Sequence, residues 1–311
     1  MRSGVWSSSD LELFEGTFRA FGSSCRIVSD LGEHAVHRSV GRLEDLEARW
    51  SRFRSDSEVS ALNRKSGAWV ECSEVTIDLV RRAVDASIRT RGLFNPLVLD
   101  ALEALGYDRD HRRLSPPRGA VEPGPEVALP SPLGIDVAGG AVRLPGGARF
   151  DPGGLGKGRA CDLVLDDLLD DGAQWAYVSL GGDVRFGGEE LARRGTTVEI
   201  QDPIDHASVW GTTEIRGGAL ASSSTLVRRW SHRGRTHHHL LDRAGRSARG
   251  RRVAATAFAP TACWADVVAK CLLIDDRLGR AEVEEWDIGA LVFDRSGESV
   301  AYGWAEPDFD A

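Results

Sequence analysis

The sequence lacks the cysteine patterns of a disulfide-stabilised or zinc-binding protein. Its 311 residues include five cysteines, with no CxxC pair and no spacing typical of metal ligands. An odd number leaves one cysteine over in any complete disulfide pairing. We therefore expect reduced, mostly buried thiols and a reducing compartment. The five are Cys25, Cys72, Cys161, Cys263 and Cys271.

The chain also lacks any apolar run long enough to cross a bilayer. Residues 1–15 contain one arginine and no apolar segment of the kind found in signal peptides. Both absences predict a cytoplasmic protein without stable membrane association. A formal net charge of −8 argues against a surface that binds nucleic acid broadly.

Glycine, by contrast, is abundant, with 35 residues against 12 prolines, and it gathers in a few short motifs. This pattern favours tight backbone turns around a ligand over a flexible linker. A hydrophobic content of 41% in a chain of this length is typical of a globular protein with a large core.

Hydrophobic periodicity predicts a chain that contains both helices and strands. Residues 110–132, rich in Pro, Arg and Gly, are expected to form an exposed loop. The expected helices cover 36–50, 73–91, 159–170 and the run around Asp266, and the expected strands cover 14–29 with a break at Gly22, part of 141–149, 175–179 and 290–293.

The predicted helix over residues 262–273 carries one acidic and one basic side chain, Asp266 and Lys270, among apolar and small residues. Positions i and i+4 share a face of an α-helix, so the two side chains point the same way. This run alone leaves two interpretations open: an internal ion pair or part of a site for a charged ligand.

Residues 151–158 (Asp-Pro-Gly-Gly-Leu-Gly-Lys-Gly) lead directly into the expected helix 159–170. A glycine-rich turn at a helix N-terminus exposes backbone N–H groups to an anion, and Lys157 adds a positive charge. The spacing matches neither a Walker A loop nor a Rossmann fingerprint. Phosphate binding and a simple glycine-rich connection both remain open from this motif alone.

Three further motifs are each ambiguous in isolation. Residues 181–183 (Gly-Gly-Asp) fit a hairpin turn or a close approach to a ligand. Residues 92–96 (Gly-Leu-Phe-Asn-Pro) fit a turn that closes a helix, with Phe94 as a stacking surface. Of His237, His238 and His239, one or two are expected to be exposed, and an inward one would bind a phosphate or a carboxylate.

Taken together and in order, these motifs resemble the ApbE-type FAD:protein FMN transferases. The resemblance implies an α+β fold of mixed sheets and packed helices, forming two tightly joined lobes around an FAD cleft. It makes residues 14–305 one domain, with a flexible extension at 1–13 and a tail at 306–311. The matching segments are 21–23, 57–63, 92–96, 151–158 with Asp162, 178–183, 221–224, 238–242 and 265–269.

The resemblance implies an enzyme that uses Mg²⁺ to cleave the pyrophosphate of FAD. The FMN half is attached by a phosphoester bond to a Thr or Ser of an acceptor flavoprotein, and AMP is released. The residues suit this chemistry, because a pyrophosphate needs backbone donors and a cation, a flavin needs an apolar wall, and Mg²⁺ needs oxygen ligands.

The site residues that the resemblance implies fall into three groups. The catalytic group is Asp266, His239 and Lys270, and the metal ligands are the Gly154 carbonyl and the Asp266 carboxylate. The FAD contacts are Phe21, Phe53, Asn63, Leu93, Phe94, Asn95, Asp151, Lys157 and Leu241.

Lys270 departs from the family pattern, which has Thr at this position; the Ala-Asp-x-x-Ala-Lys form resembles a variant branch. A protonated lysine cannot ligate Mg²⁺ and would repel it. Either Lys270 supplies part of the metal's charge, or Mg²⁺ binds through Asp266 while Lys270 swings away. Losing the metal would lower the rate of phosphoryl transfer more than the affinity for FAD. The alternative to a transferase is therefore a non-catalytic or weakly FAD-hydrolysing flavin-binding protein.

Overall fold

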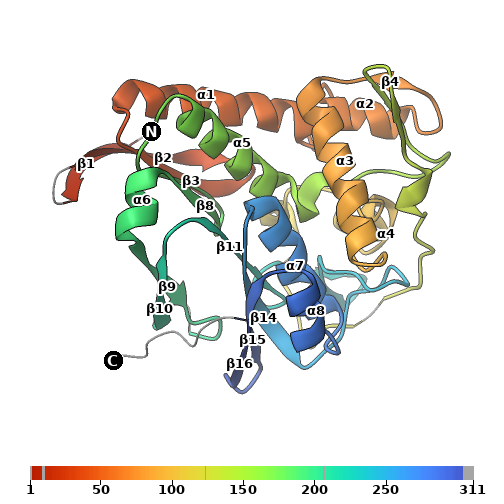
Figure 1. Cartoon of the computed structure of the whole chain (residues 1–311). Helices are drawn as coiled ribbons and strands as arrows, with labels where there is room; N and C mark the ends of the chain where they lie inside the picture. Colours follow the sequence, from red (N-terminus) through yellow and green to blue (C-terminus); the bar gives the residue numbers. More distant parts are fainter. Residues whose placement is uncertain (1, 9–10, 123, 206, 304–311) are drawn as a thin grey trace.

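A nine-stranded sheet forms the centre of the computed structural model, which describes residues 2–8, 11–122, 124–205 and 207–303 (Figure 1). Every neighbouring pair of strands in it is antiparallel. In spatial order the strands are β1 (Arg2–Ser8), β2 (Leu11–Ala20), β3 (Ser23–Ser29), β7 (Ala176–Leu180), β8 (Asp183–Gly187), β11 (Gly218–Ser224), β14 (Arg252–Ala259), β15 (Gly289–Asp294) and β16 (Ser299–Tyr302).

Three small antiparallel sheets surround this central sheet. They pair β9 (Thr196–Gln201) with β10 (Val209–Ile215), β12 (Arg229–His232) with β13 (Arg235–His238), and β6 (Ala141–Arg143) with both β4 (Val70–Glu71) and β5 (Asp136–Ala138). The α+β class is therefore confirmed, and the sheets are built from antiparallel pairs.

The helices pack against the central sheet and against one another (Figure 1). Helices α5 and α7 contact its middle strands, and α1 lies along β2 and β3. None of the helices that the structure describes is both long and apolar enough to cross a bilayer. They are α1 (Glu33–Trp50), α2 (Glu58–Arg64), α3 (Glu74–Arg89), α4 (Leu99–Ala104), α5 (Gly156–Asp170), α6 (Glu189–Arg194), α7 (Ala262–Ile274) and α8 (Arg280–Glu285).

The longer elements lie where the sequence predicted them. The strand pair over 14–29 corresponds to β2 and β3, and the helices at 36–50, 73–91 and 159–170 correspond to α1, α3 and α5. Strand β2 begins at Leu11, so the last residues of the range expected to be an N-terminal extension belong to the main sheet, and β1 extends that sheet further.

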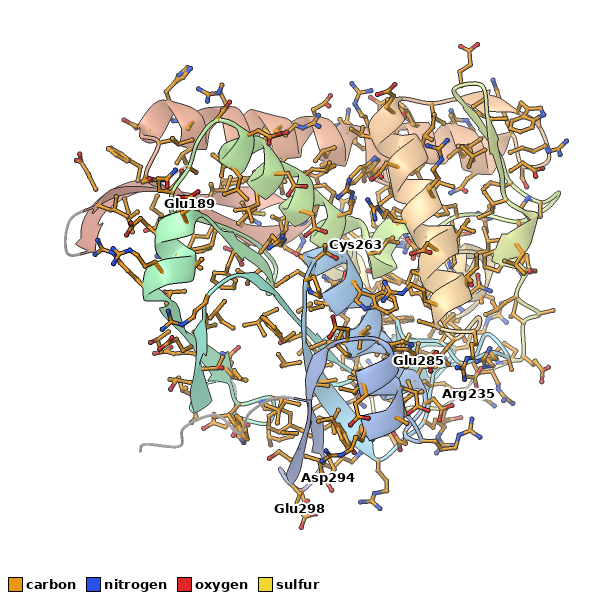
Figure 2. The ribbon with its side chains drawn as sticks, viewed as in Figure 1. Glu189, Arg235, Cys263, Glu285, Asp294 and Glu298 are labelled. Atoms are coloured by element: carbon orange, nitrogen blue, oxygen red, sulfur yellow. The ribbon has the colours of Figure 1, made fainter. Side chains whose placement is uncertain are left out.

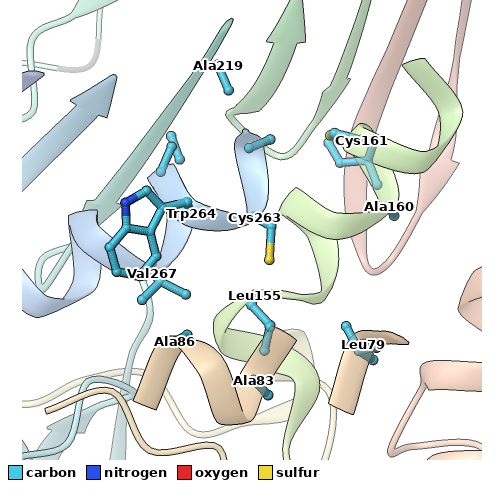
Figure 3. Close-up of a cluster of buried hydrophobic side chains, with 14 of the residues drawn as sticks. Leu79, Ala83, Ala86, Leu155, Ala160, Cys161, Ala219, Cys263, Trp264 and Val267 are labelled. Atoms are coloured by element: carbon cyan, nitrogen blue, oxygen red, sulfur yellow. The ribbon is translucent and has the colours of Figure 1, made fainter. Parts of the chain in front are cut away.

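Helix α7 is buried on every side, from Ala262 to Leu273. Figure 3 shows three of its residues, Cys263, Trp264 and Val267, among side chains of α3 and α5. A helix that is apolar all round belongs to a protein core, so any charge on it is held in the interior. Asp266 and Lys270 are the two charged residues of this helix.

Most other charged side chains lie at the periphery, as Figure 2 shows for Glu189, Glu285 and Glu298, while Cys263 lies in the interior. The exceptions include the buried Asp151, Asp162 and Asp183. All five cysteines are free thiols; four are buried and Cys72 is partly buried. The expectation that the cysteines are mostly buried is confirmed, and their reduced state stays a prediction.

Candidate functional site

Helices α5 and α7 approach each other closely at Gly158. A Cβ at this position would lie 2.3 Å from the carbonyl oxygen of Ala262. One turn further along α5, the Asp162 carboxylate accepts hydrogen bonds from the backbone N–H groups of Ala262 (2.7 Å) and Cys263 (3.0 Å). Asp162 therefore caps the start of α7 and fixes the position of α7 relative to α5.

Four charged side chains meet where α5, α7 and the β7–β8 hairpin come together; we call them the lysine–aspartate cluster. Lys157 pairs with Asp183 and lies 4.0 Å from Asp266 Oδ2, and Lys270 donates to Asp266 Oδ1. Both aspartate side chains are 1% exposed, against 12% for Lys157 and 10% for Lys270. Because buried charge is costly unless it is paired, the alternation of sign is what makes this arrangement tolerable.

The cluster holds Lys157 in the charged form. Burial alone would lower the pKa of Lys157, but the carboxylates of Asp183 and Asp266 outweigh it, and the pKa lies above its ordinary value. Burial also raises the pKa of Asp183, as does the charge of Asp266, while Lys157 opposes the shift. At neutral pH Lys157 is therefore an ammonium ion buried beside two carboxyl groups.

A tight turn delivers Asp183 to this cluster. Gly181 (φ +63°) and Gly182 (φ +99°) join β7 to β8 in a two-residue hairpin, which requires positive φ at both positions. A Cβ on Gly181 would lie 2.7 Å from Ser23 Oγ. The hairpin interpretation of this motif is confirmed, and it places Asp183 at the first, buried position of β8.

Two cavities meet at the cluster. The first has a volume of about 370 Å³ and the second about 440 Å³, both within the range of small-molecule sites. The second lies over β9, β11 and β14 and includes Ser222 and Thr256, whose hydroxyl oxygens are 2.8 Å apart. The residues that line both cavities are Gly153, Lys157, Arg228, His239 and Lys270.

The structure brings most of the expected site residues together around the first cavity. All the expected FAD contacts except Asn63 line it, as do Gly154, His239 and Lys270, and Asp266 lines the second cavity. The Asn63 amide is instead bound to the backbone of Phe150, accepting from its N–H (2.7 Å) and donating to its carbonyl (2.9 Å). Asn63 therefore holds the backbone of Phe150, directly before the glycine-rich segment.

Aromatic rings form one wall of the first cavity. Phe21 and Trp50 lie 6.4 Å apart between ring centroids, and so do Phe53 and Tyr107. The Arg52 guanidinium carbon lies 4.3 Å from the Phe53 centroid and 4.7 Å from that of Tyr107. Phe53 is 49% exposed, which places an apolar ring at the cavity rim. This wall suits a flat, aromatic ligand.

Sequence reasoning missed two arginines of the site. Arg52 Nε lies 3.5 Å from Asp151 Oδ1, and Asp151 also accepts the N–H of Gly153 (3.1 Å). Arg228 lines both cavities, and no carboxylate among the described residues lies within ion-pair distance of it. Neither residue belongs to a recognisable motif in a chain this rich in arginine, so the sequence offered no signal for either.

The three consecutive histidines separate into two roles. His237 Nδ1 lies 3.1 Å from the Glu122 carbonyl oxygen, and His238 Nε2 lies 2.9 Å from that of Ala248. Both rings are buried, so the expectation that one or two histidines are exposed is wrong for these two. Strand β13 also ends at His238, so the alternation of faces does not extend to His239.

His239 is the histidine of the site. Its Nδ1 is buried and has no hydrogen-bond partner within the described part of the chain. Burial lowers its pKa well below the ordinary value, and the charges of Arg228, Lys270 and Lys157 lower it further. The imidazole is therefore neutral at pH 7 and has a nitrogen free to accept a proton.

The residues around Asp266 do not fit a divalent cation. Lys157 Nζ lies 4.0 Å from Asp266 Oδ2, and Lys270 Nζ donates to Oδ1. Both oxygens of this carboxylate therefore already face an ammonium group, and both ammonium groups would repel a dication. No group of three or more His, Cys, Asp or Glu able to hold a metal occurs in the residues described. The side chains around Asp266 are therefore a poor match for Mg²⁺, and the assignment of the Gly154 carbonyl as a ligand stays a prediction.

Two curated relatives are similar in sequence. The FAD:protein FMN transferase of Rhodobacter capsulatus is 28% identical over 251 residues, 75% of this chain and 46% of the relative. A protein of the same name from Klebsiella pneumoniae (strain 342) is 27% identical over 210 residues, 67% of this chain and 63% of the relative. The chain thus matches about half of the first relative's length and less than two thirds of the second's.

The fold and the family model extend the comparison to most of the chain. The crystal structure of the ApbE protein from Thermotoga maritima superposes with a TM-score of 0.81 at 23% identity, covering 94% of this chain and 97% of that one. The model of the ApbE family matches residues 21–291. The chain belongs to the ApbE family.

Proposed function

We propose that this chain is an FAD:protein FMN transferase. It splits FAD at the diphosphate and attaches the FMN half to a Ser or Thr hydroxyl of an acceptor protein. The observation that carries the proposal is the lysine–aspartate cluster, which lies where two cavities meet. The names of the similar proteins support the same reaction.

The two cavities suit two substrates. The first, with its aromatic wall, suits FAD, whose diphosphate would lie against Lys157, Lys270 and Arg228. The second, whose lining includes Ser222 and Thr256, opens the same cluster to an acceptor side chain. An in-line reaction needs the attacking and leaving oxygens on opposite sides of the reacting phosphorus. An acceptor that approaches from the second cavity, with FAD in the first, would meet this requirement.

The reaction is a phosphoryl transfer in which one P–O bond replaces another. The acceptor oxygen attacks the phosphorus of the FMN half, and the bond from that phosphorus to the bridging oxygen breaks. AMP leaves with the bonding electron pair, and the proton of the acceptor hydroxyl passes to His239. Lys157, Lys270 and Arg228 stabilise the charge on the phosphate oxygens.

Substrate binding itself makes His239 a better base. Without a ligand, the nearby charges of Arg228, Lys270 and Lys157 lower the pKa of His239, in addition to the effect of burial. A diphosphate carries negative charge to these same cations and offsets their effect. His239 therefore gains basicity when FAD is bound.

The test is to incubate the protein with FAD and a library of short peptides that carry a central Thr or Ser and flanks randomised over all residues except Thr and Ser. We expect AMP in solution and peptides heavier by FMN minus water, and neither product in reactions with a matched library that has Ala at the centre. FAD bound without AMP or modified peptide would favour a flavin-binding protein instead. We place the reaction in the cytoplasm, which the five free thiols support.

A further inference from the structure

The chain uses lysine almost nowhere except at this site. It contains 39 Lys and Arg residues, of which only Lys65, Lys157 and Lys270 are lysines. Two of the three belong to the lysine–aspartate cluster, and Lys65 is exposed at the end of α2. Nearly all other basic positions of the chain are arginine, whereas the two basic positions of this cluster are lysine.

An ammonium ion resembles a bound metal ion more closely than a guanidinium does. Lysine carries a compact point charge with three donors, whereas arginine presents a broad planar fork. Lys270 is one helical turn from Asp266, and its Nζ contacts both the carboxylate and, at 3.3 Å, the backbone carbonyl of that residue. A carboxylate and a carbonyl oxygen are the ligands of a hard cation.

The pair is not a closed internal ion pair. Lys270 lines both cavities, so its ammonium group is within reach of a ligand in either. Asp266 Oδ2 is buried but has no hydrogen-bond partner among the residues described. Arg228, beside the cluster, has no carboxylate partner in the described ranges, so a positive charge remains unmatched at the point where the cavities meet.

We propose that Lys270 takes the place of a divalent cation, so that this chain binds the diphosphate of FAD without Mg²⁺. The inference rests on the proposed function and identifies how its substrate is held. Lys270 is anchored by Asp266, Lys157 by Asp183, and Arg228 completes the positive charge offered to the two phosphates.

The first test measures FAD affinity from the quenching of flavin fluorescence, in excess EDTA and in excess Mg²⁺. For the wild-type protein we expect dissociation constants within about twofold of each other. Lys270→Thr should bind FAD about tenfold or more weakly in EDTA, the effect of losing one charge-assisted contact, and should recover affinity with Mg²⁺. Lys65→Thr, the matched change at the exposed lysine, should behave as wild type.

The second test uses Mn²⁺ as a paramagnetic probe of the metal site, read by electron paramagnetic resonance without FAD. We expect no stoichiometric Mn²⁺ binding to the wild-type protein and the appearance of one site in Lys270→Thr. The wild-type measurements in both tests need no variant. They therefore decide the proposal even if the Lys270→Thr protein fails to fold.

The possible failures are distinguishable. Wild-type protein that binds FAD only with Mg²⁺, or that binds Mn²⁺ stoichiometrically, overturns the role of Lys270 and leaves the transferase proposal standing. Wild-type protein that binds FAD in neither buffer overturns the transferase proposal and this inference with it.

Discussion

At the scale of the residue, the environment of Asp266 and Lys270 is determined by side chains far away in the sequence. Helical spacing predicted that these two would lie together, and they do. Their partners Lys157 and Asp183 come from another helix and from a hairpin. No local sequence pattern predicts that these four side chains lie together in the fold. The glycine-rich motif and the Gly-Gly-Asp motif each kept a structural interpretation open until the fold placed them side by side.

Removing one member of the cluster should destabilise the folded protein. Lys157→Met leaves Asp183 buried beside Asp266 without its main counter-charge, which should cost about 3–5 kcal/mol of unfolding free energy. Urea denaturation measures this cost, with Lys65→Met as the matched control and an expected change within about 0.5 kcal/mol. Adding Asp183→Asn to Lys157→Met should restore part of the loss. A Lys157→Met protein as stable as wild type would show that the pair is not formed.

His238 should make the protein sensitive to mild acid. Burial lowers the pKa of His238 from 6.5 to about 4 in the folded protein. The unfolded chain therefore binds more protons between these values, so stability is fully present above pH 6.5 and is lost as the pH falls towards 4. The loss is on the order of 3 kcal/mol.

Unfolding free energies measured at pH 7 and pH 4.5 test this contribution. His238→Gln keeps a polar side chain without the titration, so its stability should fall less between the two pH values. An identical fall in wild type and His238→Gln would assign the acid sensitivity to other groups.

At the scale of the element, the close contact between α5 and α7 sets the geometry of the site. Gly158 permits the approach, and Asp162 caps α7 at the same contact. Burial raises the pKa of Asp162 to about 6, with the backbone N–H groups of α7 opposing the shift. The glycine-rich segment that resembled a phosphate loop therefore also fixes the position of α7, the helix that carries Asp266 and Lys270.

Gly158→Ala should separate the two helices. The new Cβ meets backbone atoms of Ala262 that cannot rotate away, so we expect a loss of about 1–3 kcal/mol in stability and much weaker FAD binding. Gly41→Ala is the matched control, because this glycine lies within α1 and a Cβ there meets nothing within 4 Å. That control should be stabilised by up to about 1 kcal/mol. Equal behaviour of the two variants would contradict the close-contact account.

Sequence periodicity predicted the long elements and missed the short ones. Helices α1, α3 and α5 repeat their apolar positions over several turns, whereas α4, α6 and α8 span six residues each, too few to establish a period. The side-chain role of Asn63 was likewise out of reach, because its partner Phe150 is 87 positions away. Arg52 and Arg228 reach the site for the same reason, through tertiary placement.

At the scale of the whole molecule, the central sheet and its helices bring segments from the entire chain to one place. The residues lining the first cavity run from Phe21 to Ile274, and the second adds Phe293. The family could be recognised from the order of short motifs, since these are the segments that converge. The acceptor protein could not be identified, because the second cavity carries no motif that names its ligand.

Binding of FAD should stabilise the molecule as a whole. A ligand that binds only the folded state adds about 2.7 kcal/mol at a concentration 100 times its dissociation constant. Thermal unfolding should therefore shift upward with FAD in both wild type and His239→Gln, because the substitution removes the proposed base and keeps the cations. A shift lost in His239→Gln would mean that His239 serves binding and not proton transfer.

The most direct measurement of the central claim is the stoichiometry of transfer on a peptide selected from the Thr/Ser library. Mass spectrometry gives the FMN attached to the peptide, and chromatography gives the AMP released in the same reaction. The account predicts one AMP for each FMN–peptide with the wild-type protein, and neither product at an appreciable rate with His239→Gln. Wild-type protein that binds FAD yet forms neither product would contradict it.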